Sequence, residues 1–225
     1  MLSDAAKVPG VAKRIEAVRA MRLKSTDVGG RALATRAHQM REMYEAKRQT
    51  IIMPRTSSES RPYLPAGLLD ARSVVSSEAF AIFDAPIWQL SLITSRLHLM
   101  WIATVCGQLE TRYRYSNVLG WNTFPVPTLT EKNTADLTRS AEDILLAREV
   151  HFPATIAELY EVKDGTSKMP EDLRAAHARN DEVLERIYIG RRFRNDTERL
   201  EKLFDLYTKM TAGQGLPKKK PEATV

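Results

Sequence analysis

The chain has 225 residues, 43% of them hydrophobic, which is enough for a packed core in one large domain or two small ones. Its apolar stretches are broken by polar residues well before the roughly 20 residues that a membrane span needs, and no apolar signal segment opens it, so we expect a cytoplasmic protein with no membrane partner. Residues 1–125 hold 17 Lys and Arg against 10 Asp and Glu, whereas residues 126–225 hold 17 against 18, and this basic first part suggests contact with a polyanion such as nucleic acid.

The N-terminal part mixes helical and strand patterns. Apolar residues at helical spacing, with basic residues over the other faces, predict a basic amphipathic helix over 11–24. After the Gly29-Gly30 break, a second helix over 31–46 competes with an irregular surface segment. Strands are predicted over 48–54 and 79–83, joined by a turn-rich connection.

A long, largely buried helix is predicted next. Apolar residues recur at helical spacing between Asp84 and Gly107. Asp84 can cap this helix, Pro86 suits its first turn and Gly107 can end it. Residues 108–116 then alternate between two kinds of side chain, which predicts a strand. The loop over 117–127 is rich in Gly and Pro, and we expect its two aromatic residues to hold one unit against the next.

The remainder of the chain is helical in pattern. Residues 131–150 carry apolar residues on one face, and Thr155 with Glu158 forms a capping box for a short helix. Pro170 opens a further helix. A last helix is marked by Leu200, Leu203, Phe204 and Tyr207.

These elements predict an α+β fold that is predominantly helical overall. A mixed helix and strand domain is expected over 1–127, and a small helical bundle over 128–212. Residues 213–225 contain too few apolar residues to fold, so we expect a disordered tail.

The strand over 108–116 is the best candidate for a site. Its alternation projects Glu110, Arg112 and Arg114 from one face. An arginine can donate two parallel hydrogen bonds to O6 and N7 of guanine, and a glutamate can accept from N4 of cytosine, so these residues can read C·G pairs in the major groove. The alternative is a solvated strand with exposed ion pairs. Spacing alone favours this alternative over base readout.

The connection that follows the first strand is a second candidate. Arg55, Ser57, Ser58 and Arg61 offer positive charge and hydroxyl groups next to a strand end. Such residues can hold DNA phosphates and fix the register of a protein on the duplex. An ordinary surface turn, in which serines cap their own backbone, explains the composition equally well.

Other reactive residue types favour structural roles. Arg96, His98 and Cys106 lie in the predicted buried helix, where hydrogen bonding and packing are the better interpretation. The sequence lacks a Gly-rich nucleotide loop, a Walker lysine, a Gly-x-Ser-x-Gly elbow, paired histidines at metal spacing and the Asn-Pro-Pro-aromatic tetrapeptide of amino-methylating DNA methyltransferases. We therefore expect no cofactor site, no metal site and no catalysis from this chain alone.

Five ordered segments together resemble one family. The chain is similar, from about Ile15 to Tyr207, to the C-terminal portion of MmeI-like DNA methyltransferases and type IIL restriction-modification enzymes. The segments that carry the resemblance are IIMPRTSSESRPYLP, ITSRLHLMWIATVCGQLETRYRYS, WNTFPVP, LLAREVHFPATIAELYE and MPEDLRAAHARNDEVLERIY.

The resemblance implies a target recognition domain, partial at its N-terminus, followed by a C-terminal helical domain. The family's base-reading positions match Glu110, Arg112 and Arg114, which turns the balance toward base readout and a C·G or G·C target. The parent proteins also contain a methyltransferase core that binds S-adenosylmethionine and flips an adenine out of the duplex. Because the motifs of that core are missing here, the resemblance implies either a fragment or a separate specificity subunit.

The expected function is therefore sequence-specific recognition of double-stranded DNA for an adenine-specific methyltransferase or restriction-modification enzyme, whose methyltransferase core lies in the same protein or in a separately encoded partner. One alternative is a non-catalytic helical interaction subunit that binds DNA without sequence preference. Another is the remnant of a split gene. Base selectivity conferred by Glu110 and Arg112 distinguishes the first function from the general DNA-binding subunit. An upstream reading frame that encodes the Asn-Pro-Pro-aromatic tetrapeptide would indicate fragmentation or a split system, and its absence would indicate an orphan.

Overall fold

The computed structural model describes residues 4, 6–41 and 44–212. The chain divides into two compact units, Met1–Glu45 and Ala46–Val225. Within the described ranges, no helix combines the length and apolar character required to cross a membrane. The predicted disordered tail over 213–225 lies outside the described residues.

The first unit is built on helix α2, Pro9–Leu23, which confirms the basic helix predicted over 11–24. A proline in its first turn suits the helix start, where the missing N–H would have no partner. No residue of α2 is buried. The guanidinium of Arg22 nevertheless fastens the helix to the following segment, because it donates to the carbonyl oxygens of Leu33, Arg36 and Gln39.

The segment after α2 corrects two predictions. Gly29 and Gly30 do not break the chain but lie in α3, Val28–Ala32, because the Asp27 side chain caps this helix by accepting from both glycine amides. The helix alternative for 31–46 is also wrong, because the described part of this range holds the end of α3 and then only the short 3-10 helix η1, Leu33–Arg36, which agrees with the irregular alternative.

The second unit begins with an antiparallel sheet in the order β3-β1-β4. The strands β1, Gln49–Pro54, and β4, Ala79–Phe83, confirm the two predicted strands. The strand β3, Gly67–Asp70, lies in the segment predicted as a turn-rich connection, so it is an element that the sequence pattern does not predict. Ile51 at the centre of β1 is fully buried and pairs with both neighbouring strands, so this sheet forms one wall of the core.

The long helix predicted from Asp84 is in fact two helices, α4, Trp88–Ile93, and α5, Arg96–Val105. Ser95 interrupts it with extended backbone and caps α5 by accepting from the amide of His98. Asp84 is not a cap. It has a φ of 54°, and its carboxylate accepts from the amides of Lys47 and Arg48 at the start of β1.

The C-terminal half forms the predicted helical bundle, with a small hairpin added. Its elements are α6, Glu131–Glu149; α7, Ile156–Leu159; β7, Val162–Lys163; β8, Thr166–Ser167; α8, Glu171–Ile189; and α9, Asp196–Thr211. The Thr155–Glu158 capping box is present as predicted, and Gly190 ends α8 in the left-handed conformation that glycine adopts easily. Helix α6 packs against α4 and α8, and α9 packs against α5.

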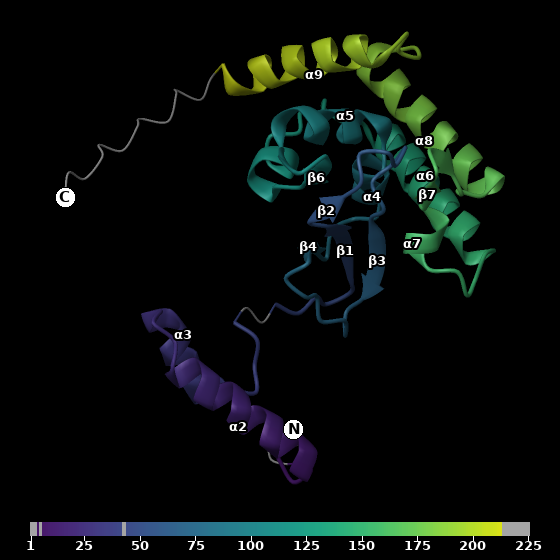
Figure 1. The fold of residues 1–225 in the computed structure, drawn as a ribbon. Coiled ribbons are helices and arrows are strands. Elements are labelled where there is room, and N and C mark those ends of the chain that lie inside the picture. Colours follow the sequence, from purple (N-terminus) through teal and green to yellow (C-terminus); the bar gives the residue numbers. More distant parts are fainter. Residues whose placement is uncertain (1–3, 5, 42–43, 213–225) are drawn as a thin grey trace. The chain divides into compact units, whose positions relative to one another are not determined.

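The loop over 117–127 lies inside this second unit, in which the helices α4, α6 and α8 stand side by side next to the sheet of β1, β3 and β4 (Figure 1). It opens with a single π turn, η2, Asn117–Trp121. Phe124 is buried, with its ring 4.7 Å edge-on from His98, and Tyr188 of α8 donates to the carbonyl oxygen of Pro125 at 2.8 Å. The aromatic residues of this loop therefore hold α5 against α8, as expected.

Candidate nucleic-acid interface

A second small sheet carries the predicted site residues. Its strand order is β2-β6-β5, with β2 at Thr56–Ser57, β5 at Gly107–Leu109 and β6 at Arg112–Arg114. The topology brings the two candidate groups of residues, which lie far apart in sequence, into one sheet. Because β5 and β6 are antiparallel neighbours, they form a hairpin.

The single strand predicted over 108–116 is wrong, because the chain reverses at Glu110 and Thr111. Leu109 pairs with Arg112 across the hairpin, which leaves a turn of two residues. Such turns require a positive φ at one or both central positions, and Glu110 supplies it with a φ of 58°. The sequence signals nothing of this kind, since glycine or asparagine is the usual residue there.

The reversal changes how the base-readout candidates are arranged. Arg112 and Arg114 still share one exposed face of β6, whereas Glu110 lies in the turn. The Glu110 carboxylate pairs with the Arg112 guanidinium at 2.7 Å, and the two side chains are 75% and 48% exposed. The hairpin therefore presents an acceptor and a forked donor next to each other at its tip.

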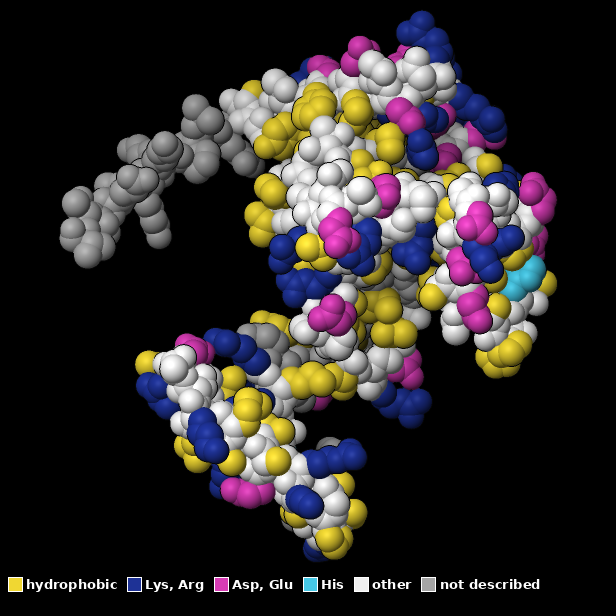
Figure 2. Space-filling model, in the orientation of Figure 1, with side chains coloured by type: hydrophobic (Ala, Val, Ile, Leu, Met, Phe, Trp, Pro, Cys, Tyr) yellow, Lys and Arg dark blue, Asp and Glu magenta, His cyan; other side chains and the backbone are white. Residues whose placement is uncertain are grey.

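The surroundings of the hairpin are also charged. Arg114 is exposed at the centre of the sheet, opposite Gly107 on one side and Thr56 on the other. Glu59, in the connection after β2, has a carboxyl whose pKa is lowered by a backbone amide, by a hydrogen bond from Thr111 and by the nearby charge of Arg112. Figure 2 shows Lys and Arg side chains next to Asp and Glu side chains over the surface that β2 and β6 occupy in Figure 1.

Two of the four phosphate candidates are surface groups. The Arg55 guanidinium donates to the carbonyl oxygen of Ser77 at 3.0 Å and lies 5.1 Å from the centre of the Phe80 ring. Contacts within the chain therefore already use part of its hydrogen-bonding capacity. The Ser58 hydroxyl hydrogen bonds with the hydroxyl of Ser60 at 2.8 Å.

The other two phosphate candidates face inward. Ser57 is buried in β2, opposite Tyr113 of β6. Arg61 is half-buried: its Nε donates to the carbonyl oxygen of Tyr160 at 3.1 Å and its Nη1 to the Ser57 hydroxyl at 3.3 Å. Contact between DNA and any of the four stays a prediction.

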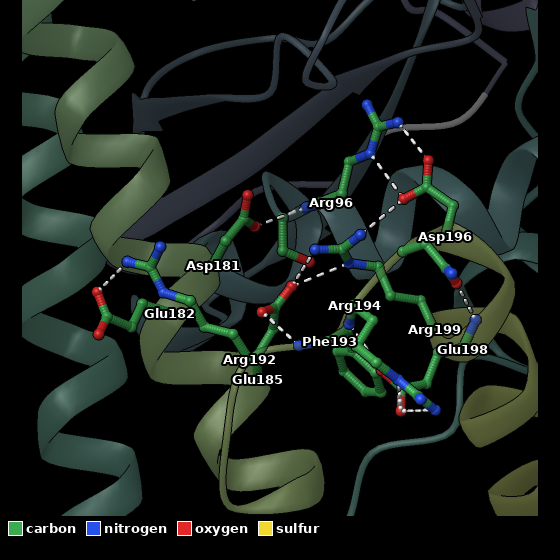
Figure 3. A network of polar contacts seen from close by, with 12 residues as sticks. Arg96, Asp181, Glu182, Glu185, Arg192, Phe193, Arg194, Asp196, Glu198 and Arg199 are labelled. Atoms are coloured by element: carbon green, nitrogen blue, oxygen red, sulfur yellow. Dashed lines mark hydrogen bonds and ion pairs between the residues drawn. The ribbon is translucent and has the colours of Figure 1, made fainter.

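Arg96 and His98 have the structural surroundings expected of them. The Arg96 guanidinium forms an ion pair with Asp196 at 2.6 Å, and its backbone amide donates to Asp181 (Figure 3). His98 is fully buried, so desolvation lowers its pKa to about 3, and its Nε2 hydrogen bonds with the Tyr115 hydroxyl at 3.1 Å. A neutral imidazole at this position joins α5 to the end of the hairpin.

Cys106 is half-buried at the end of α5. Burial raises the pKa of its thiol, and a raised pKa makes a cysteine a poorer nucleophile at neutral pH, because the thiolate is the reactive form. Its sulfur lies 3.9 Å from the carbonyl oxygen of Ser116. These surroundings agree with a packing role.

The fold is of the α+β class, with a recognition domain and a helical domain in one chain. Residues 1–128 match the family model of the MmeI target recognition domain, and residues 129–214 match that of the MmeI C-terminal domain. The chain therefore belongs to the MmeI family.

Two characterised relatives show the same similarity. The chain is 39% identical over 203 residues to DNA methyltransferase A of Bacillus subtilis (strain 168), an overlap of 90% of this chain and 22% of that protein. The solved structure of the type IIL restriction-modification enzyme MmeI in complex with DNA aligns with a TM-score of 0.85 and 32% identity, over 94% of this chain and 28% of that one. The chain thus spans less than a third of the length of either relative.

Proposed function

We propose that this chain is the sequence-specific DNA recognition module of an adenine-specific DNA methyltransferase or restriction-modification enzyme. The observation that carries the proposal is the exposed Glu110–Arg112 pair at the tip of the β5–β6 hairpin, with Arg114 exposed next to it. Membership of the MmeI family supports it, since one relative is a DNA methyltransferase and another was solved in complex with DNA.

The chemistry of the pair suits a C·G base pair. The major groove admits a two-stranded β ribbon, an arginine donates to O6 and N7 of guanine, and a glutamate accepts from N4 of cytosine. Because an exposed ion pair contributes little to stability, DNA can replace the contact between Glu110 and Arg112 at low cost. In the absence of DNA, the ion pair keeps both side chains at the hairpin tip.

The ligand in this proposal is double-stranded DNA, and the protein partner is a methyltransferase core. That core would bind S-adenosylmethionine and act on the flipped adenine. The chain described here would contribute no cofactor-binding residue, and its role would be to select the site at which the core acts.

The decisive experiment is selection of bound duplexes from a random library at near-physiological salt. The wild-type chain is compared with the double variant Glu110→Ala, Arg112→Ala, and with Glu171→Ala, Arg174→Ala, which removes an exposed Glu–Arg pair from α8. We expect a motif with an invariant C·G or G·C pair, and loss of about 1–3 kcal/mol of discrimination at that position in the hairpin variant alone.

Two other results would contradict the proposal. Binding of the wild-type chain without sequence preference would favour a general DNA-binding interaction subunit. A motif that is unchanged in the hairpin variant would locate base readout elsewhere in the chain.

A further inference from the structure

The segment between β2 and β3 lies across the helical domain and is fastened there at three points. The Nε of Arg61 donates to the carbonyl oxygen of Tyr160, and the hydroxyl of Tyr63 donates to the Asp181 carboxylate at 2.9 Å. The Nη1 of Arg148 donates to the carbonyl oxygen of Ala66 at 2.7 Å. The partners are between 82 and 118 residues apart in sequence, so these contacts join the recognition domain to the helical domain.

The surroundings of these anchors are buried and closely packed. Tyr160 and Ala66 are fully buried and Arg148 is almost so. The Tyr63 ring stacks on that of His177, with 4.1 Å between centroids and an angle of 13° between planes. Because a buried polar group without a partner is costly, the contacts define one position of this segment on the helices.

Arg61 extends this fixed position into the hairpin sheet. Besides its bond to Tyr160, its Nη1 donates to the hydroxyl of Ser57, at 3.3 Å. Ser57 lies in β2 and pairs with Tyr113, the residue of β6 between the two exposed arginines. β2 has two residues and β6 has three, so few backbone hydrogen bonds hold this sheet. Arg61 adds a side-chain bridge from the β2 edge of the sheet to the helices, beside the contact between His98 and Tyr115 at the end of β6.

We propose that Arg61 is a positioning residue for DNA recognition. By joining the end of α7 to β2, it fixes the β5–β6 hairpin relative to the helical domain, so that Arg112 and Arg114 meet the bases in one register. Specific readout requires such preorganised side chains, supported by a second layer of contacts. The proposal rests on the proposed function, and it assigns to Arg61 an effect on base choice instead of a contact with phosphate.

The DNA test compares Arg61→Ala with Arg72→Ala, which removes the same charge from a side chain that is 93% exposed. The affinity for the selected duplex is divided by the affinity for a duplex with one altered base pair, at several salt concentrations. We expect Arg61→Ala to reduce this ratio by about tenfold, the scale of a single mismatch, without change in the salt dependence. An unchanged ratio, with a slope of log affinity against log salt that is smaller by about 0.9, would overturn the proposal and make Arg61 a phosphate contact.

A second measurement does not need DNA. Amide hydrogen exchange is followed in the full-length chain for peptides covering the β5–β6 hairpin and, as the internal reference, β1 and β4. We expect exchange in Arg61→Ala to accelerate in the hairpin and to stay unchanged in the reference strands. Equal acceleration in both regions would show general destabilisation, and no acceleration would show that Arg61 does not hold the hairpin, so either result overturns the proposal.

Two milder variants guard against misfolding. Ser57→Ala removes only the hydrogen bond between Arg61 and β2, and Arg61→Lys can keep one of the two hydrogen bonds. Both variants should therefore show a smaller loss of base discrimination and a smaller acceleration of exchange than Arg61→Ala. If the wild-type chain has no base preference, the proposed function fails, whereas the exchange measurement still decides the role of Arg61.

Discussion

Glu110 with Arg112, at the hairpin tip, and Glu185 with Arg199, between α8 and α9, form ion pairs of the same chemical kind in different surroundings. The first pair is 75% and 48% exposed, whereas the second is 4% and 17% exposed. Glu185 also accepts from the amide of Phe193 at 3.0 Å. The exposed pair is free to exchange its partners for a ligand, and the buried pair is committed to the fold.

The buried pair belongs to a larger network that unites three helices (Figure 3). Arg199 also contacts Asp196, which pairs with Arg96 of α5, and the Arg96 amide donates to Asp181 of α8. Burial raises the pKa of the Asp181 carboxyl to about 6, although hydrogen bonds from the Arg96 amide and from Tyr63 act against the shift. The contrast between the two regions yields predictions that separate structural arginines and carboxylates from those available to DNA.

The largest effect is expected where the buried pair is broken. Glu185→Ala removes the acceptor of the Phe193 amide and of the Nε and Nη2 of Arg199, which keeps its contact with Asp196, in a region with little access to water. Removing one partner of a buried pair costs about 3–5 kcal/mol. The free energy of unfolding, measured by urea titration, should fall by that amount.

The matched variant at the exposed pair is Glu110→Ala, which should change the free energy of unfolding by less than about 1 kcal/mol. Glu185→Gln retains acceptor capacity and should lie between the two. Equal losses from Glu185→Ala and Glu110→Ala would refute the distinction between a committed pair and an exchangeable pair.

A smaller effect is expected from pH. Burial lowers the pKa of His98 and of His177 to about 3, so stability from both is complete above pH 6.5, the unfolded value, and is lost as the pH falls. Asp181 acts in the opposite sense, because its pKa is raised from 3.8 to about 6 and the folded chain retains its proton in that range. For these three groups the difference is one proton, a contribution of about 1.4 kcal/mol per pH unit lost on acidification between about pH 6 and pH 4.5. Carboxylates with a lowered pKa, such as Glu198 at about 2, add to the loss toward the lower end of this range.

Two variants should move this pH dependence in opposite directions. His177→Gln removes one of the two histidines, which should reduce the slope of unfolding free energy against pH by about 1.4 kcal/mol per pH unit. Asp181→Asn removes the opposing carboxyl and should increase the slope by a similar amount. Urea unfolding at intervals across this range gives the slopes, and parallel curves for all three proteins would disprove the assignment.

The contrast between the regions also explains what the sequence could predict. Strands β1 and β4, helices α2 and α6 and the capping box at Thr155 follow from local patterns, because periodicity and capping depend on neighbours in the sequence. The two-residue strand β2 has no pattern of its own and exists only through its pairing with β6.

The candidate site was predictable in composition but not in geometry. The types and proximity of Glu110, Arg112 and Arg114 suggested groove chemistry. The alternation of these charges runs from the turn into β6 without a break, so it concealed the reversal of the chain. The bridge made by Arg61 could not be found at all, because its partner Tyr160 lies 99 residues further along the chain. Long-range hydrogen bonds leave no periodic signal.

The smallest effect on stability, and the sharpest separation of structure from function, is expected at the hairpin turn. Glu110 has a φ of 58°, a conformation that costs a non-glycine residue about 1–2 kcal/mol, so Glu110→Gly removes strain while adding entropy to the unfolded chain. The two terms oppose each other, and the unfolding free energy should change by less than about 1 kcal/mol. Selection of bound duplexes should nevertheless show relaxed preference at the C·G or G·C position, because the acceptor for cytosine is gone.

Thr111→Gly is the control for this variant, since Thr111 lies in the same turn without a positive φ. It should lower the unfolding free energy by at least about 0.5–1 kcal/mol, the usual cost of added backbone freedom, because it also removes the hydroxyl that donates to Glu59. Base preference should stay unchanged. If Glu110→Gly instead destabilises the chain by more than about 2 kcal/mol, Glu110 is a structural residue of the hairpin. Its pair with Arg112 would then resemble the buried network more than a pair that contacts bases. If the Glu110→Gly protein is stable and its base preference is unaltered, base contacts from this hairpin would come from the arginines of β6 and not from Glu110.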